Sequence, residues 1–207
     1  MFAEAAFAVV CLSGALALRP WRMLRADAQP QLLTPLLASL AILPWVWALP
    51  SLRSMPLQLQ LSGAGLVLLM LGWPLAVPAL AGVGLAAWLV SPMPWEQALS
   101  LTVWQGLVPA TLALALGALL RRYVADHPFI YILGRGFLGT VACLFAAAAL
   151  RQALGHTLPG TEAGLGMVAR WLMAWGDGFV TGMLCAVFVA FRPGWLATWS
   201  DRRYLHG

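Results

Sequence analysis

Charged residues are scarce in this sequence, and lysine is absent altogether. Only 9% of the 207 residues are Asp, Glu, Lys or Arg, whereas 62% are hydrophobic. A soluble domain carries about 25% charged residues and a lower apolar fraction, near half. A water-soluble core cannot hold this apolar excess. We therefore predict an all-α fold, a polytopic integral membrane bundle that forms a single domain over residues 1–207 and has the lipid bilayer as its main partner.

Cysteine is also rare, and the usual catalytic patterns are missing. The three cysteines, Cys11, Cys143 and Cys185, are far apart and lie in apolar stretches. Without Cys-x-x-Cys or Cys/His spacing, a zinc site or a disulfide framework is disfavoured. His-Glu-x-x-His, Gly-x-Ser-x-Gly and P-loop patterns do not occur either. We therefore expect no enzyme and no resident cofactor, and we rank transport or solute binding above catalysis.

All twelve basic residues are arginines, and they lie between the apolar runs. They form no basic stripe with interleaved aromatic residues, so we expect no nucleic-acid partner. Arginines placed between apolar runs are typical of topology signals instead. The first apolar run has no positive leader and contains Glu4, with its arginines after it. We expect a retained helix there, not a cleaved signal peptide.

Seven apolar stretches are long enough to cross a bilayer, which takes about 20 residues. The third and fourth are close together, and Pro74 and Pro78 between or within them lack the amide donor that a continuous helix needs. Either two full spans or a broken pair fits this pattern, so we predict six to seven transmembrane helices. The stretches are residues 2–18, 32–49, 57–73, 75–91, 98–120, 129–150 and 166–191.

The arginines also predict the orientation of the chain. With seven spans, eight arginines fall on one face, and Arg53 and Arg151 fall on the other. Arg135 and Arg170 lie near or within spans and are not counted. Because basic residues collect on the cytoplasmic side, we predict an external N-terminus and a cytoplasmic C-terminus, in a multi-pass protein of the cell inner membrane.

Glycines recur in the later spans. The run GRGFLG, residues 134–139, matches a dinucleotide-binding pattern, but neither the strand nor the βαβ unit that this pattern requires is present. We interpret these glycines as points of close helix contact, as small residues are in membrane bundles. Gly178 and Gly182, four residues apart in the last span, are interpreted in the same way.

Asp177 lies deep in the last apolar run, without an acidic partner in that run. A charged group at this depth costs about 2.5–3.5 kcal/mol on insertion scales and usually faces the bundle interior. Helical spacing puts Thr181 and Cys185 on the same face. We interpret the three side chains as part of a substrate-binding stripe. The alternative is a structural ion pair between Asp177 and Arg170 or Arg135.

Three further residues are candidates for the site. Arg135 either lines a cavity as a counter-charge or extends to the interface. Gln60 either lines the same cavity or makes a plain hydrogen bond between helices. His156, in an expected external loop, is with Asp177 a weak candidate for a metal ligand. A membrane-embedded enzyme would need a second acid or a histidine within about 3 Å of Asp177.

The end of the chain carries a recognisable pattern. In GDGFVTGMLCAVFVAFRPGW, an acid-Gly-x-x-Thr run is followed by an apolar stretch and Arg-Pro. This order resembles the closing signature of the cobalt/nickel permease family of energy-coupling-factor transporters, with Asp in place of the usual Glu. The matching residues are Asp177, Gly178, Thr181, Arg192 and Pro193. The stretches LMLGWPLA and HPFIYILGRGFLG and the tail FRPGW…DRRYLHG are similar to an uncharacterised bacterial branch of that superfamily.

The resemblance implies a substrate-binding membrane component of six or seven helices, with a transmembrane coupling subunit and ABC ATPases as partners. It also implies a divalent transition-metal ion as one candidate substrate. The cobalt/nickel members bind metal through an N-terminal Met-His segment, whereas this chain begins MFAEAAF and has no histidine before His127. The leading hypothesis is therefore a permease component for a small solute. The alternative is an accessory membrane scaffold without transport activity of its own.

Overall fold

The computed structural model describes residues 2–24, 30–52, 61–124, 127–155, 163–200 and 204. Every regular element in these ranges is helical, as the composition predicts. The α-helices are α1 (Phe2–Ala17), α2 (Leu33–Leu52), α3 (Ala64–Leu71), α4 (Trp73–Val90), α5 (Trp95–Leu101), α6 (Val108–Tyr123), α7 (Gly139–Ala153) and α8 (Ala163–Phe191). Two π-helical segments, η3 (Thr102–Leu107) and η4 (Ile130–Leu138), and three short 3-10 turns complete the described chain.

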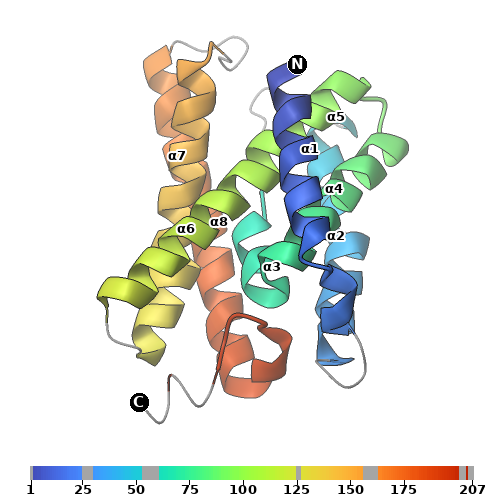
Figure 1. Ribbon diagram of the computed structural model, residues 1–207. Coiled ribbons are helices and arrows are strands. Elements are labelled where there is room, and N and C mark those ends of the chain that lie inside the picture. Colours follow the sequence, from blue (N-terminus) through green and yellow to red (C-terminus); the bar gives the residue numbers. More distant parts are fainter. Residues whose placement is uncertain are drawn as a thin grey trace.

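Five helical runs in the described residues are long and apolar enough to cross a membrane. They are α2, α4, the continuous run from α5 through η3 to α6, the run of η4 with α7, and α8. The apolar helix α1 is shorter, at 16 residues. Figure 1 shows that α1 begins at the end of the bundle where α7 meets α8, and that α8 ends at the opposite end.

The predicted third span, residues 57–73, is not a full-length helix. Residues 61–63 have no regular structure, and α3 covers only eight residues; residues 57–60 lie outside the described chain. At 1.5 Å per residue, α3 is about 12 Å long, well short of a bilayer core of about 30 Å. The broken arrangement therefore holds here. The sequence left two full spans and a broken pair open, because apolar composition does not report where the backbone unwinds.

Gly72 forms the break between α3 and α4. Its φ of 70° lies in a region that glycine adopts easily and other residues rarely do. Pro74 follows in the first turn of α4, where its missing amide costs nothing. A single residue thus separates α3 from α4, and the two helices pack against each other.

The eight-residue helix α3 lies inside the bundle. Seven of its residues are buried, and it contacts α2, α4, α6 and α8. Figure 1 shows α3 in the middle of the molecule, surrounded by longer helices. Since α3 is too short to reach either membrane face, both of its ends need hydrogen-bond partners from the protein.

The segment after α8 supplies the partners at the C-terminal end of α3. The backbone N–H of Ala197 donates to the Met70 carbonyl at 2.9 Å. Thr198 donates to the Leu69 carbonyl through both its backbone N–H, at 3.3 Å, and its hydroxyl, at 2.9 Å. The tail therefore completes a helix that lies more than a hundred residues earlier in the sequence.

Glycines let α8 approach η4 and α7 closely, as the sequence predicts. A Cβ added at Gly178 would overlap the Val141 side chain and lie 3.2 Å from the Phe137 carbonyl oxygen. A Cβ at Gly182 would lie 3.0 Å from Cβ of Phe137. By contrast, a Cβ at Gly176 would meet nothing within 4 Å.

This contrast gives a matched pair of variants. Replacing either Gly176 or Gly178 with Ala makes the helical conformation of that residue more favourable by about 1 kcal/mol. We expect Gly178→Ala nevertheless to lower the midpoint of thermal unfolding in lipid nanodiscs, because Val141 and the Phe137 backbone must shift. Gly176→Ala should leave the midpoint unchanged or raise it. Equal midpoints for the two variants would contradict the close packing of α8 on α7.

Candidate functional site

Asp177 is the middle residue of the 29-residue helix α8, and it is 2% exposed. Its carboxylate accepts a hydrogen bond from the backbone N–H of Ser62 at 2.5 Å and another from that of Gly63 at 3.1 Å. These two amides immediately precede α3. The carboxylate therefore caps the N-terminal end of α3, where the helix dipole favours a negative charge.

Ser62 joins three parts of the bundle at this cap. Its hydroxyl donates to the Gln105 carbonyl at 2.5 Å and accepts from the backbone N–H of Ala64 at 3.1 Å. Its own carbonyl accepts a hydrogen bond from Nε1 of Trp47 at 3.0 Å. The irregular backbone at this depth thus obtains partners from α2, η3 and α8, as unwound backbone inside a membrane bundle requires.

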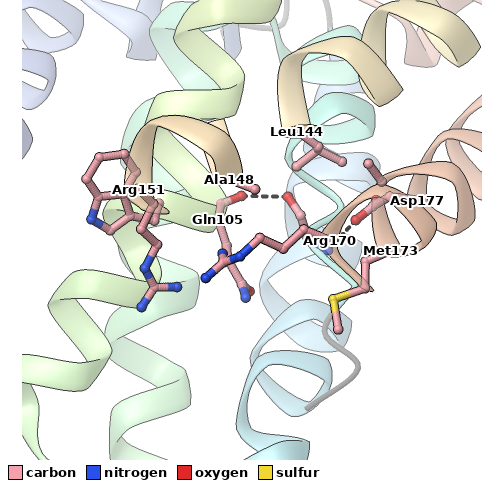
Figure 2. A pocket seen from close by; sticks show the side chains of 10 residues that line it. Gln105, Leu144, Ala148, Arg151, Arg170, Met173 and Asp177 are labelled. Atoms are coloured by element: carbon pink, nitrogen blue, oxygen red, sulfur yellow. Dashed lines mark hydrogen bonds between the residues drawn. The ribbon is translucent and has the colours of Figure 1, made fainter. Parts of the chain in front are cut away.

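A cavity of about 70 Å³ lies beside the cap. This volume would hold several water molecules or the polar end of a small solute. The residues that line it come from α7, α8, η3 and the segment before α3: Ser62, Trp104, Gln105, Leu144, Ala148, Arg151, Arg170, Met173, Ala174 and Asp177. Figure 2 shows the side-chain ends of Gln105, Arg151 and Arg170 together on one side, and Asp177 on the other.

The π-helical segment η3 places Trp104 and Gln105 on the cavity wall. In this segment the Val108 amide donates to the Val103 carbonyl, five residues back. The extra residue in this turn shifts the side-chain positions relative to a regular helix. Such π-bulges are frequent at functional sites in proteins.

Glu4 of α1 is a second buried acid, and it is hydrogen-bonded to Trp104. It is 8% exposed, and its Oε1 accepts hydrogen bonds from Nε1 of Trp104 at 2.8 Å and from the Ser100 hydroxyl at 2.9 Å. Glu4 is not among the residues that line the cavity. It links α1 to the helix that carries η3, and so it supports the position of the cavity wall.

The structure does not bring the predicted site residues into one cavity. Thr181 and Cys185 are buried on α8, 1% and 0% exposed, but they do not line the space beside Asp177. Arg135 lies near a separate space of about 10 Å³. Its guanidinium carbon is 5.3 Å from the centre of the Tyr131 ring, and its Nη1 donates to the Tyr204 hydroxyl at 3.4 Å.

Asp177 forms an ion pair with neither Arg170 nor Arg135. The structural alternative therefore does not hold as an ion pair. The carboxylate has a structural role toward the backbone of α3. Gln60 and His156 lie outside the described residues. Within the described residues, no three His, Cys, Asp or Glu side chains come together as metal ligands.

Most residues of the cavity wall were not candidates from the sequence, and Arg151 and Gln105 are two polar examples. Arg151 counted only as a topology signal, because it is followed by a polar stretch, and Gln105 stands within an apolar run. A usable signal was present: Arg151 near the end of one span and Arg170 near the start of the next lie on adjacent antiparallel helices. Helices joined by a short connection bring such positions together.

No protein-family model, curated protein or solved structure matches this chain. The geometry of the cavity and of the α3 cap therefore carries the functional interpretation.

The Asp177 cap can be tested by substitution. Asp177→Ala leaves the Ser62 and Gly63 amides without an acceptor, and each unsatisfied buried group costs about 1–3 kcal/mol. We expect a clearly lower free energy of unfolding in nanodiscs. Asp177→Asn keeps one acceptor oxygen and should give an intermediate value.

The exposed acid Glu96 in the first turn of α5 supplies the control. Glu96→Ala also removes one negative charge, yet it should change stability little. If Asp177→Ala were as stable as Glu96→Ala, the carboxylate would not be the cap that holds α3.

Proposed function

We propose that this chain is the substrate-binding component of a membrane permease and that it binds a small solute in the cavity beside Asp177. One observation carries the proposal: the backbone is broken at the mid-depth of α8, next to a cavity whose wall includes charged and amide side chains. In transporters, substrate sites lie near the middle of the membrane, where discontinuous helices end. Irregular backbone at this depth is tolerated where it is buried in protein or lines a cavity.

The walls of the cavity support a binding role. Charged side chains inside a membrane bundle are costly, and they commonly mark substrate or ion pathways. Here Arg151, Arg170 and Asp177 all line one space, together with the amide side chain of Gln105. A few polar groups that converge in a largely apolar pocket are typical of small-molecule sites.

The resemblance to the cobalt/nickel permeases agrees with this proposal and extends it to partners. We propose a transmembrane coupling subunit and ABC ATPases as partners in the inner membrane, with the N-terminus outside. The signature residues have local structural roles in this chain. Asp177 caps α3, Gly178 permits the close contact of α8 with α7, and Pro193 opens the segment that leads to Thr198.

An accessory scaffold is the second candidate, and one observation favours it. Both oxygens of Asp177 already accept hydrogen bonds from the start of α3. The buried acid is therefore explained without a solute. A scaffold would bind no solute in the cavity and would tolerate its closure.

The two candidates differ in how solutes affect stability. We would measure the thermal unfolding of the purified chain in nanodiscs with separate solutes: Co²⁺, Ni²⁺, small carboxylates, inorganic phosphate and neutral amino acids. A ligand at 100 times its Kd stabilises the folded state by about 2.7 kcal/mol. We expect at least one class to raise the unfolding midpoint.

Two substitutions on α7 test whether a stabilising solute binds in the cavity beside Asp177. Ala148 lines the cavity, whereas Ala146 is exposed on another face of the helix. Ala148→Leu should fill the cavity and remove the stabilisation, and Ala146→Leu should retain it. If no class raised the midpoint of the unmodified chain more than that of Ala148→Leu, the permease proposal would fail and the scaffold would be favoured.

A further inference from the structure

A second and larger space lies next to the cavity beside Asp177. It is a groove of about 320 Å³ between α1, the run of η3 with α6, and α7. We call it the side groove. Aliphatic and aromatic side chains form most of its wall, among them Phe7, Val108, Leu112, Leu150 and Leu154.

Few polar groups face the side groove. Among its described lining residues, polar side-chain atoms occur in Glu4, Trp104 and Thr111. Nε1 of Trp104 donates to Glu4 at 2.8 Å, and the Thr111 hydroxyl donates to the Leu107 carbonyl at 2.7 Å. The remaining surface is hydrocarbon, which favours an apolar chain or ring as its occupant.

Trp104 forms the boundary between the side groove and the cavity. Among the described residues, it is the one that lines both spaces. Its neighbours on η3 divide between them, because Val103 lines the groove and Gln105 lines the cavity. On α7, Leu150 lines the groove and Arg151 lines the cavity. An apolar space and a polar one therefore adjoin along η3 and α7.

This adjacency distinguishes the side groove from another apolar space of the molecule. That space has a volume of about 450 Å³ and lies between α1, α4 and the run of α5 with η3. It shares no described lining residue with the cavity beside Asp177. Of the two apolar spaces, the side groove is therefore the one placed to receive part of a molecule that the cavity holds.

We propose that the solute is an amphiphile, whose polar head lies in the cavity beside Asp177 and whose apolar chain passes Trp104 into the side groove. The cavity, at about 70 Å³, holds a small head group and little more. Pockets for small molecules have volumes of about 300–1,000 Å³. The side groove supplies a volume in this range, and burial of the chain there supplies most of the affinity.

This inference rests on the proposed function, because it names the class of solute for the same cavity. The charged and amide side chains of the cavity hold the polar head, and they determine which head is accepted. The groove selects for an apolar chain of suitable length. A small hydrophilic solute would leave the side groove without a role in binding.

The test uses the purified chain in nanodiscs and two homologous series of solutes. Acetate, hexanoate and decanoate share a carboxylate head, and alanine, norleucine and 2-aminodecanoate share a zwitterionic one. Calorimetry gives the affinities, with empty nanodiscs as the reference for partition into lipid. We expect the affinity in at least one series to rise with chain length, about fourfold for each CH₂ that the groove buries.

Two leucines of α6 give a matched pair of variants. Leu112 lines the side groove, whereas Leu114 is exposed on the opposite side of the helix. Leu112→Trp should fill the groove and remove the increase of affinity with chain length, while the shortest member of the series binds as before. Leu114→Trp should keep the increase.

A second pair on α1 applies if Leu112→Trp does not fold. Ala3 lines the side groove, whereas Ala6 is exposed and does not line it. Ala3→Phe should reduce the dependence of affinity on chain length, and Ala6→Phe should leave it unchanged. In Ala148→Leu, whose cavity is filled, short and long members should both bind at least about tenfold more weakly than to the unmodified chain.

The other outcomes overturn the inference in distinguishable ways. Binding of the short members without a gain from longer chains would overturn the amphiphile and leave the permease proposal standing. An equal gain in both variants of a pair would overturn it too, because the chains would then lie outside the groove. Long members that bind Ala148→Leu as tightly as the unmodified chain would overturn it in favour of a groove that holds bilayer lipid. No binding of any member, together with no stabilisation by any other solute, would overturn both proposals.

Discussion

The structure depends on the hydrogen bonds between the Asp177 carboxylate and the two backbone amides that precede α3. A helix of eight residues is far too short to be stable alone, because nucleation is costly and few bonds follow it. In the bundle interior, the ends of this helix also need hydrogen-bond partners from the protein. The Asp177 carboxylate accepts hydrogen bonds at the N-terminal end of α3, and the tail after α8 donates hydrogen bonds to the carbonyls at its C-terminal end.

The last helix, α8, must both pack closely against its neighbours and direct the Asp177 carboxylate toward the start of α3. Glycine at position 178 permits close contact with Val141 and Phe137, while its neighbour Asp177 turns toward the start of α3. One turn earlier, Ala174 and Met173 line the cavity, and Arg170 reaches it from the next turn. A single face of α8 thus provides a structural cap and part of the cavity wall.

Composition and apolar run lengths predict the all-helical fold, and five of the predicted spans coincide with helical runs that are long and apolar enough to cross a membrane. The position of Asp177 on an interior face follows from the cost of burying its charge. A broken pair was one of two alternatives from the sequence, but the unwound backbone could not be located at residues 61–63, Leu-Ser-Gly, because it depends on a distant partner. Its partner lies 115 residues away. The cavity wall was predictable only in part: a short connection between two helices brings Arg151 near Arg170, whereas Gln105 comes from a third helical run.

The two caps of α3 also determine the order in which the chain can fold. The Ser62 amide and its Asp177 partner are separated by 115 residues, and Leu69 and Thr198 by 129. Synthesis proceeds from the N-terminus, so α3 emerges long before either partner exists. Contacts between distant residues also form slowly. Until α8 and the tail after it have been synthesised, α3 therefore lacks these partners at both of its ends.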